Sequence, residues 1–280
     1  MEIDAAFLRP LLKRRVNDSH KGDYGHLLLV CGCQAMPGAA VLATGAALKS
    51  GCGLVTLHSS AYAVQAAAFN FPSAMLSEDP DGCFSLVPEG LGRFSAIAVG
   101  PGLGKAPQTV GALAKLLKLA CEAQIPMVLD ADALNILAQR PDLLGSIPAG
   151  SVMTPHLGEL RRLTVFGTPE EKDAAVFALC RQTGCVVVAK GFHKEIYCPD
   201  GQILTNTTGN PGLAKGGSGD VLTGLVGGLL ARGYSARDAA ALGVWIHGYA
   251  GDCLTEQCTA EAYSSRDLIE ALHQGFKALM

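Results

Sequence analysis

Short runs of aliphatic residues alternate along this chain with helix-length segments, and the alternation is repeated about five times. Strands buried on both faces of a parallel sheet are apolar throughout, and the segments that connect them form helices. The pattern therefore predicts an α/β fold with a mostly parallel central sheet and helices on both of its faces. The predicted strands are 27–30, 53–58, 96–99, 126–129, 151–153 and 185–189.

Polar or glycine-rich clusters directly follow five of these runs. In an open parallel sheet the carboxyl ends of the strands lie along one edge, and ligands bind at that edge. Clusters that are far apart in the sequence should therefore meet there. The clusters are residues 31–32, 100–104, 130–135, 154–159 and 190–194.

Three segments lie outside this alternation of strands and helices. Residues 1–20 resemble an amphipathic helix that ends in a basic cluster at 13–15, which we interpret as a solvated face. Residues 77–92 resemble a loop. A hairpin is predicted over 195–204, because two short apolar runs flank a Pro-Asp-Gly turn.

A glycine-rich loop at 206–220 leads directly into an apolar helical pattern. Gly216, Gly217 and Gly219 lack a Cβ, so they can adopt positive φ and let a phosphate approach the backbone. The unpaired N–H groups at the helix start, together with the positive end of the helix dipole, form an anion site. Asp220 would repel a resting phosphate there, but it could take a proton from a hydroxyl that attacks phosphorus.

Another interpretation of Asp220 remains open. Aspartate is a favoured N-cap residue and a common neighbour of glycine turns. The loop is not a P-loop, because Lys215 precedes the glycines, and it lacks the spacing of a dinucleotide-binding fingerprint. The density of glycine at one helix start favours a functional role.

Charged residues in three of the strand-end clusters are further candidates. Asp130 and Asp132 could hold Mg²⁺ through water or cap a helix, and we favour capping for one and site-lining for the other. His156 and Glu159 could form a capping arrangement, or Glu159 could orient a metal-bound water, but the pair alone is too little for a zinc site. Lys190 could meet phosphate, although lysines at strand ends are usually solvated.

Composition argues against several classes of function. A net charge of −3 and a pI near 6.2 give no electrostatic case for binding nucleic acid or an anionic membrane. We expect no signal peptide and no membrane span, and therefore a cytoplasmic protein. The ten cysteines are scattered without paired C-x-x-C motifs and are expected to be free thiols. The length suits a single domain over 1–280.

Several motifs resemble, in order and spacing, those of the ADP-dependent NAD(P)H-hydrate dehydratases of the ribokinase-like superfamily. The resemblance extends from about Lys21 to Leu279, and the chain is similar to the stand-alone form without the epimerase domain of many relatives. The motifs are Lys21-Gly-Asp-Tyr-Gly-His26, Gly38-Ala-Ala40, Gly100-Pro-Gly-Leu-Gly104, Asp130-Ala-Asp-Ala-Leu134, Thr154-Pro-His-Leu-Gly-Glu159, Lys190-Gly191 and Asn210-Pro-Gly-Leu-Ala-Lys-Gly-Gly-Ser-Gly-Asp220.

The resemblance implies the repair of reduced nicotinamide cofactors whose ring has been hydrated. A phosphoryl group would pass from ADP to the ring hydroxyl of the S-form. Elimination of phosphate would then leave NADH or NADPH, AMP and phosphate. Asp220 would be the catalytic base, and the turn containing Gly217 and Gly219 would stabilise the migrating phosphoryl group through its amides.

The resemblance also implies a set of binding residues. Ala40, Gly102, His156 and Asp220 would contact the hydrated cofactor. Mg²⁺ would bridge nucleotide phosphates with no protein ligand assigned to it, and a homotetramer is expected. The chain departs from the family pattern at Leu157, where proline is expected, and in the residues after Gly191. The residues implied to hold the adenine nucleotide are Lys190, Gly191, Phe192, His193, Lys194 and Gly219.

Two other functions remain open. A small-molecule kinase of the same fold would use the same base and anion site, with ATP as donor and a vitamin precursor or sugar as acceptor. The His156-x-x-Glu159 sequence and the 210–215 segment favour the dehydratase. A non-catalytic nucleotide-binding module would not depend on Asp220.

Overall fold

Two strands, β2 (His26–Val30) and β5 (Ala96–Val99), pair in parallel near the middle of the sheet in the computed structural model, which describes residues 1–191 and 194–280. The other strands are β1 (Glu2–Ile3), β3 (Leu54–Ser60), β4 (Met75–Asp79), β6 (Met127–Leu129), β7 (Val152–Met153), β8 (Val186–Ala189), β9 (Glu195–Tyr197) and β10 (Ile203–Asn206). In these described residues the order is β1-β10-β9-β8-β7-β6-β5-β2-β3-β4, and β9 alone runs antiparallel to its neighbours. The prediction of a mostly parallel sheet is confirmed.

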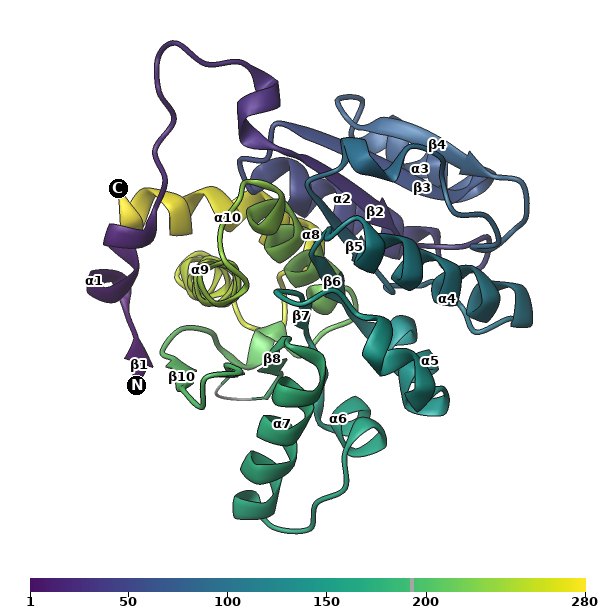
Figure 1. Ribbon diagram of the computed structural model, residues 1–280. Helices are drawn as coiled ribbons and strands as arrows, with labels where there is room; N and C mark the ends of the chain where they lie inside the picture. Colours follow the sequence, from purple (N-terminus) through teal and green to yellow (C-terminus); the bar gives the residue numbers. More distant parts are fainter. Residues whose placement is uncertain (192–193) are drawn as a thin grey trace.

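Helices cover both faces of this sheet, as predicted (Figure 1). The α-helices are α1 (Ala5–Leu8), α2 (Pro37–Lys49), α3 (Ala61–Asn70), α4 (Pro107–Glu122), α5 (Ala131–Gln139), α6 (Leu157–Leu163), α7 (Pro169–Thr183), α8 (Ser218–Ala231), α9 (Ala236–Thr255) and α10 (Ser265–Leu279). Short 3₁₀ helices lie at Arg9–Leu11, Lys21–Tyr24, Leu91–Arg93, Pro141–Ser146 and Pro211–Leu213. Helices α2, α3, α8, α9 and α10 contribute to the core on one face, and α4 to α7 to the core on the other.

The side chains of β2 show how the sheet separates the two cores. Leu27 and Leu29 belong to the core beneath α2 and α8, whereas Leu28 and Val30 belong to the core beneath α4 and α5. All four are fully buried. Because a strand alternates its side chains between the two faces, a strand that is covered on both must be apolar throughout, as this one is.

The chain changes direction across the sheet between β2 and β5. β3 and β4 follow β2 toward one edge, whereas β6, β7 and β8 follow β5 toward the other. At the carboxyl ends of these two strands the N–H of Gly32 donates to the carbonyl of Pro101, over 2.7 Å. Ligands of open α/β sheets bind at such a reversal of strand order, so the fold places a site beside the 31–32 and 100–104 clusters.

The other strand-end clusters also meet, as expected. His156 and Lys190 form a parallel β-bridge beyond the ends of β7 and β8. The Nζ of Lys190 lies 2.7 Å from Oδ1 of Asp130, at the end of β6. Residues that are 60 positions apart in sequence are therefore in direct contact at the edge of the sheet.

Helix α8 packs so closely on α2 that their backbones touch. A Cβ at Gly224 would collide with the carbonyl of Ala43, and a Cβ at Gly228 with the hydroxyl of Ser50. The absence of side chains at these positions lets α8 lie directly against α2 on the sheet, where α8 contacts β2, β5 and β6 and α2 contacts β2 and β3. This packing fixes the axis of the helix that begins with the glycine-rich loop.

The prediction for residues 1–20 is wrong. The helix α1 ends at Leu8, a 3₁₀ turn containing Pro10 follows it, and the chain then continues without regular structure to His20. Proline at this point lacks the N–H needed to continue a helix. The basic cluster is also not simply solvated, because Arg14 and Arg15 donate to the carbonyls of Met280 and Gly51.

Two further predictions can be compared with the structure. The segment 77–92 was predicted as a loop, but its first residues belong to β4, an edge strand paired in parallel with β3. The predicted hairpin is confirmed by β9 and β10, which pair antiparallel. All ten cysteines are free. The helices of the described residues include none that is both long and apolar enough to cross a membrane.

Candidate active site

The glycine-rich loop ends in an open helix start. Gly217 is the N-cap of α8 and has φ 88°, in the left-handed region that favours glycine. The N–H of Ser218 donates to the carbonyl of Lys215. Among the described residues, no acceptor contacts the N–H groups of Gly219 and Asp220 in the first turn. Two backbone donors and the positive end of a 14-residue helix therefore face the same space, as an anion site requires.

Hydrogen bonds from α9 and α10 hold this turn in place. Nε2 of His247 donates to the carbonyl of Ser218 over 2.9 Å. The hydroxyl of Ser265 donates to the carbonyl of Gly216 over 2.8 Å. Because His247 is buried, the pKa of its imidazole falls to about 3, so this donor remains neutral at physiological pH. The turn is preorganised without a ligand.

Lys215 anchors the loop rather than pointing toward the helix start. Its Nζ donates to three carbonyls, those of Ala260, Glu261 and Tyr263, over 2.7, 2.8 and 2.6 Å. These contacts use the donors of the ammonium group. Lys215 therefore has a structural role, and the positive charges that face the site come from other segments.

Asp220 occupies the first turn of α8 and carries a perturbed carboxyl group. Burial raises its pKa to about 6, and the nearby negative charge of Asp130 adds to the shift, while Lys190 opposes it. A carboxyl group with this pKa is largely ionised at pH 7 yet basic enough to accept a proton from a hydroxyl. Perturbed carboxyl groups of this kind are concentrated at functional sites.

Asp130 and Lys190 form a buried ion pair beside Asp220. Oδ1 of Asp130 accepts from Nζ of Lys190, and Oδ2 accepts from the hydroxyl of Thr223 over 2.7 Å. The residue after Asp130, Ala131, has φ 47°, a conformation that is strained for a residue with a Cβ. The network holds Lys190 close to the start of α8, where a Cβ at Gly219 would lie 3.5 Å from its Nζ.

His156 and Glu159 form a capping box at the start of α6. Nδ1 of His156 accepts from the N–H groups of Gly158 and Glu159, and Oε2 of Glu159 accepts from the N–H of His156. This arrangement requires the imidazole proton to reside on Nε2, which lies 3.4 Å from Oε1 of Glu159. Burial raises the pKa of the Glu159 carboxyl group, against the hydrogen bond from the backbone of His156. The capping interpretation of this pair is confirmed.

A cavity of about 630 Å³ opens between these elements. Lys194 lines it and is almost fully buried, and burial lowers the pKa of its ammonium group to about 8, although Asp252 favours the charged form. The cavity is large enough for a nucleotide. Its lining residues are His156, Lys190, Gly191, Lys194, Gly209, Asn210, Pro211, Leu213, Ala214, Lys215, Ser218, Gly219, Leu222 and His247.

The cavity brings together most of the residues implied to hold the adenine nucleotide: Lys190, Gly191, Lys194 and Gly219. Phe192 and His193 lie outside the described residues. Gly217 is in the adjoining turn. Of the residues implied to contact the hydrated cofactor, His156 lines the same cavity and Asp220 follows Gly219 directly.

Ala40 and Gly102 lie in a different part of the sheet edge. Ala40, in α2, faces Gly32 at the end of β2, and Gly102 has φ 60° and approaches Ala39 of the same helix. They are therefore beside the reversal of strand order rather than in the cavity. Asp220 connects the two regions, because burial raises the pKa of the Cys31 thiol directly after β2 and the nearby charge of Asp220 adds to that shift.

The prediction for Asp130 and Asp132 is half right. Asp130 lines the site through its contacts with Lys190 and Thr223. Asp132 does not cap the helix: its Oδ2 accepts from the N–H of Gly104 over 2.9 Å and so fixes the second glycine cluster. The side chain of Asp130 occupies the N-cap position but makes no capping hydrogen bond.

Sequence reasoning missed three residues that organise the site. Thr223 binds Asp130, and its position three residues after Asp220 on the same face of α8 is a signal that could have identified it. His247 anchors Ser218 through the carbonyl of that residue. Asp252 accepts from the N–H of Gly209 and so holds the glycine-rich loop against α9. The two α9 residues had no detectable signal in the sequence.

The carboxylates of this region are engaged by the protein itself. Nowhere in the described chain do three His, Cys, Asp or Glu side chains gather in a way that could bind a metal ion. Both oxygens of Asp130 already accept hydrogen bonds. Glu159 is occupied by its own helix start. The site is therefore suited to a cation carried by a polyphosphate, not to one held mainly by protein ligands.

Comparison with known proteins agrees with this geometry. The family described as NAD(P)H-hydrate dehydratase matches residues 27–274. A protein of Neisseria meningitidis named ADP-dependent (S)-NAD(P)H-hydrate dehydratase is 40% identical, over 88% of this chain and 82% of its own. A bifunctional NAD(P)H-hydrate repair enzyme of Moorella thermoacetica is also 40% identical, over 96% of this chain. The chain spans about half the length of such bifunctional relatives.

Solved structures give the same result. The ADP/ATP-dependent NAD(P)H-hydrate dehydratase of Bacillus subtilis, co-crystallized with ATP and Mg²⁺, superposes with a TM-score of 0.84 and 30% identity, covering 99% of this chain and 98% of its own. A hydroxyethylthiazole kinase of Pyrococcus horikoshii has a TM-score of 0.64 at 15% identity, which shows a shared ribokinase-like fold alone. By sequence and by structure, this chain belongs to the NAD(P)H-hydrate dehydratase family.

Proposed function

We propose that this protein catalyses the ADP-dependent dehydration of the S-form of hydrated NADH and NADPH, releasing AMP and phosphate. The observation that carries the proposal is the position of Asp220, a carboxyl group with a raised pKa, in the first helical turn whose Gly219 and Asp220 amides have no acceptor among the described residues. A base and an anion site at this spacing suit the transfer of a phosphoryl group to a hydroxyl.

Asp220 takes the proton from the ring hydroxyl as that oxygen attacks the β-phosphorus of ADP. The O–P bond to the ring forms while the bond between the β-phosphorus and the bridging oxygen breaks, so AMP is the leaving group. Departure of phosphate from the ring carbon, together with loss of a proton from the neighbouring ring carbon to solvent, then restores the ring double bond. A pKa near 6 leaves Asp220 ionised at pH 7, and it returns the proton to solvent between turnovers.

The amides of Gly217, Gly219 and Asp220 stabilise the charge on the migrating phosphoryl group. Fixed donors of this kind are effective because they need no reorganisation during the reaction. Lys190, held by Asp130, and Lys194, buried in the cavity wall, supply the positive charge for the nucleotide phosphates. Gly191 lets the nucleotide lie close to the end of β8.

The hydrated cofactor would bind on the other side of Asp220. Ala40 and Gly102 are small residues beside the reversal of strand order, so the hydrated ring can approach the sheet edge there. His156 lines the nucleotide cavity, and its Nδ1 accepts from the backbone N–H of Gly158. We propose that Mg²⁺ arrives with the nucleotide, where it would neutralise phosphate charge.

A recovery assay tests the proposal. The protein is incubated with the S-form of hydrated NADH, ADP and Mg²⁺, and the absorbance of reduced nicotinamide is followed near ~340 nm, as expected for a hydride-carrying cofactor. Absorbance should return in proportion to AMP formed, with ATP and no nucleotide as the comparison reactions. No recovery, together with phosphorylation of a vitamin precursor or sugar from ATP, would instead establish the kinase alternative.

The proposed substrates also bear on the setting of the protein. Free thiols at all ten cysteines suit a reducing compartment, and we propose the cytoplasm, where the reduced cofactors are used. We also propose that residues 1–280 form one domain and that it assembles as a homotetramer. Light scattering on the purified chain measures the assembly directly.

A further inference from the structure

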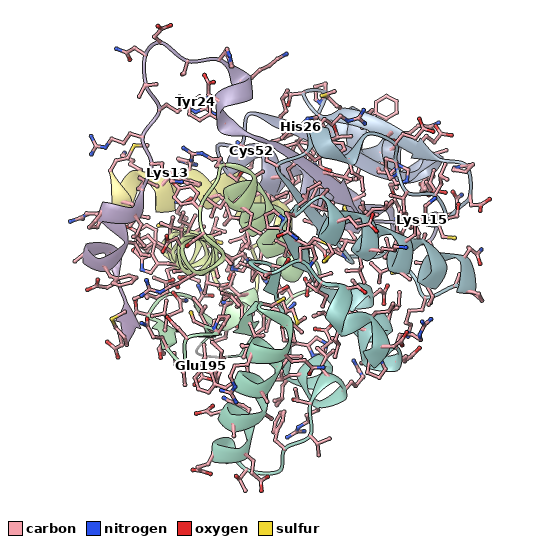
Figure 2. The ribbon with its side chains drawn as sticks, viewed as in Figure 1. Lys13, Tyr24, His26, Cys52, Lys115 and Glu195 are labelled. Atoms are coloured by element: carbon pink, nitrogen blue, oxygen red, sulfur yellow. The ribbon has the colours of Figure 1, made fainter. Side chains whose placement is uncertain are left out.

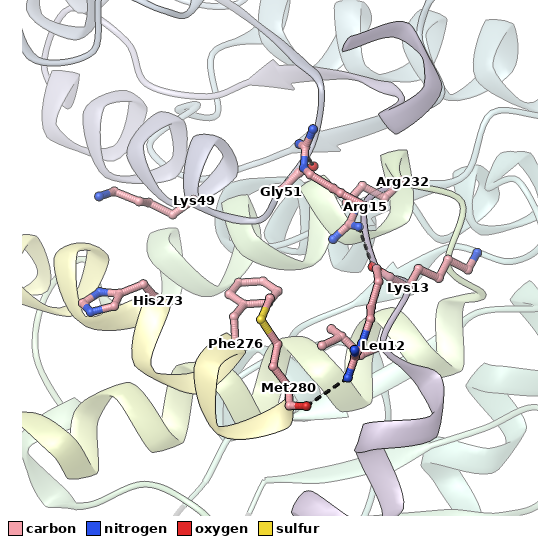
Figure 3. A pocket seen from close by; sticks show the side chains of 10 residues that line it. Leu12, Lys13, Arg15, Lys49, Gly51, Arg232, His273, Phe276 and Met280 are labelled. Atoms are coloured by element: carbon pink, nitrogen blue, oxygen red, sulfur yellow. Dashed lines mark hydrogen bonds between the residues drawn. The ribbon is translucent and has the colours of Figure 1, made fainter. Parts of the chain in front are cut away.

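A second cavity lies at the opposite end of α8, away from the candidate active site. Its volume is about 540 Å³, and it is enclosed by the N-terminal segment, the ends of α2 and α8, and the last turns of α10 (Figure 3). The rise from Asp220 to Arg232, at the end of α8, is about 18 Å, so the two sites are separate. The lining residues are Leu12, Lys13, Arg14, Arg15, Lys49, Gly51, Arg232, His273, Phe276 and Met280.

The lining carries a concentration of positive charge. Five of these ten residues are lysine or arginine and none is acidic, in a chain whose net charge is −3. One cation, Lys49, is paired with a carboxylate, that of Glu270, over 2.8 Å. Among the described residues no Asp or Glu carboxylate lies within ion-pair distance of Arg15 or Arg232, whereas Arg14 donates to a main-chain oxygen of Met280, the last residue of the sequence, over 3.0 Å. The cavity therefore presents uncompensated charge.

Backbone carbonyls orient these cations without neutralising them. Arg15 donates to the carbonyl of Gly51 over 2.8 Å and stacks on the ring of Tyr24, 3.9 Å from its centroid. Arg232 donates to the carbonyl of Lys13 over 2.9 Å. A guanidinium group has several N–H donors, and one carbonyl leaves most of them free for another acceptor. The arginines are thus held in place with donors to spare.

Cations are common at helix C-termini, where they complement the helix dipole, and Lys49 and Arg232 fit that simpler explanation. It does not account for residues 13–15, which reach the same place from a segment without regular structure. Nor does it account for the cavity that the five cations surround, since a carbonyl cap needs none. Two independent features, charge and enclosed volume, coincide here.

The cavity also has an apolar part. Leu12, Phe276 and Met280 contribute its hydrocarbon lining. In Figure 3 the ring of Phe276 lies beside Met280, with Lys49 and His273 on one side and Arg15 and Arg232 on the other. A purely inorganic anion would leave this surface in water. A ligand with both phosphates and a flat apolar group would cover it.

We propose that this cavity is a second ligand site, specific for a nucleoside polyphosphate. The phosphates would contact Arg14, Arg15 and Arg232, whose guanidinium groups recognise phosphate oxygens in pairs. Lys49 would exchange Glu270 for the ligand. The base would lie against Phe276. This binding does not require the chemistry of the site at Asp220.

Calorimetric titration of the full chain with ADP, at low and at physiological salt, tests the inference. Two binding events are expected, and the second should weaken as salt rises, because its charges are partly exposed. The double variant Arg14→Gln/Lys49→Gln should lower the affinity of the second event about tenfold or more, the loss expected for charge-assisted contacts. Neither residue touches the first cavity.

A matched control and a local readout complete the test. Lys115→Gln removes one lysine charge from an exposed position of α4, on the other side of the molecule from Lys13 (Figure 2). It should leave both binding events unchanged. Photolabelling with 8-azido-ADP should mark peptides from 10–20 and 266–280 in addition to those of the first site. A single binding event, an equal loss in the control variant, or no label in these peptides would overturn the inference. Because binding is measured, a failure of the proposed catalysis would not affect the outcome.

Discussion

The turn at Gly217 offers a sharp test of how the anion site is built. Gly217 has φ 88°, and a Cβ placed on it would collide with Cδ1 of Leu42 and lie 3.1 Å from the hydroxyl of Ser265. Gly216, its neighbour, has open space where its Cβ would lie. Substitution with alanine at these two adjacent positions therefore changes the same amount of side chain but produces very different strain.

The magnitude follows from the backbone conformation. A left-handed conformation costs a residue with a Cβ roughly 1–2 kcal/mol, and the collision with Leu42 can be relieved partly by moving its flexible side chain. If Gly217→Ala relaxes by leaving the left-handed region, the amides of Gly219 and Asp220 lose their alignment. A strain of this size corresponds to about a 5- to 30-fold loss in kcat/KM. Gly216→Ala should remain within about twofold of the wild type.

The assay compares three quantities for both variants: kcat/KM in the recovery reaction, the dissociation constant of ADP, and the melting temperature. We expect kcat/KM and ADP affinity to fall together in Gly217→Ala, because the amides contact the phosphates in both states. Full activity in Gly217→Ala, or an equal loss in Gly216→Ala, would refute the idea that this turn is the anion site.

Four further predictions follow from the site and from the packing of α8. Asp220→Asn should lower kcat by at least ~10²-fold while ADP still binds, as measured by stopped-flow assay and calorimetry. Because Asp220 must be ionised to act as a base and its pKa is about 6, kcat/KM should be constant above that pH and fall about tenfold per unit below it; a flat profile to pH 5 would contradict the assignment. The ammonium group of Lys194 has a pKa of about 8, so ADP affinity should fall as pH rises above 8, and Lys194→Met should remove that dependence. Gly224→Ala should destabilise the fold by about 1–3 kcal/mol through overpacking against Ala43, seen as a lower melting temperature, whereas Gly111→Ala, with open space around it, should not.

The sheet and its ligand-binding edge could be predicted because they are written in local patterns. Apolar runs such as 27–30 indicate strands buried on both faces, and the residues that follow them fall at the carboxyl edge by the logic of a parallel sheet. The hairpin at 195–204 depended on a turn of three residues. These inferences needed no knowledge of distant contacts.

The prediction of a helix over residues 1–20 was wrong for a physical reason. Its apolar residues are spaced as in a helix, but Pro10 interrupts the hydrogen-bond ladder, and the segment is held by contacts with Gly51, Gly233 and Met280. Tertiary contacts of this kind override local propensity, and no local pattern announces them. The edge strand β4 was missed because one of its faces is exposed and its last three residues, Ser77, Glu78 and Asp79, are polar.

Within the site, sequence patterns located single residues but not their partners. Asp130, Lys190 and Asp220 could each be proposed from their positions after strands or at a helix start. Their mutual contacts could not, because Thr223 is 93 residues from Asp130 and becomes its hydrogen-bond partner only in the fold. The pKa of Asp220 depends on that same arrangement, so its value as a base could not be deduced before the structure.

The backbone contact between α8 and α2 has a consequence for how this enzyme class can change. Gly224 and Gly228 have no side chains whose replacement could shift α8 by small steps. The position of the proposed base, in the first turn of α8, is therefore fixed by packing in the interior of the molecule. Variation in substrate preference is therefore expected in the loops that surround the base, such as those after β2 and β5. Single substitutions are therefore expected to move the proposed base very little, whereas substitutions in the surrounding loops can change which substrate is bound.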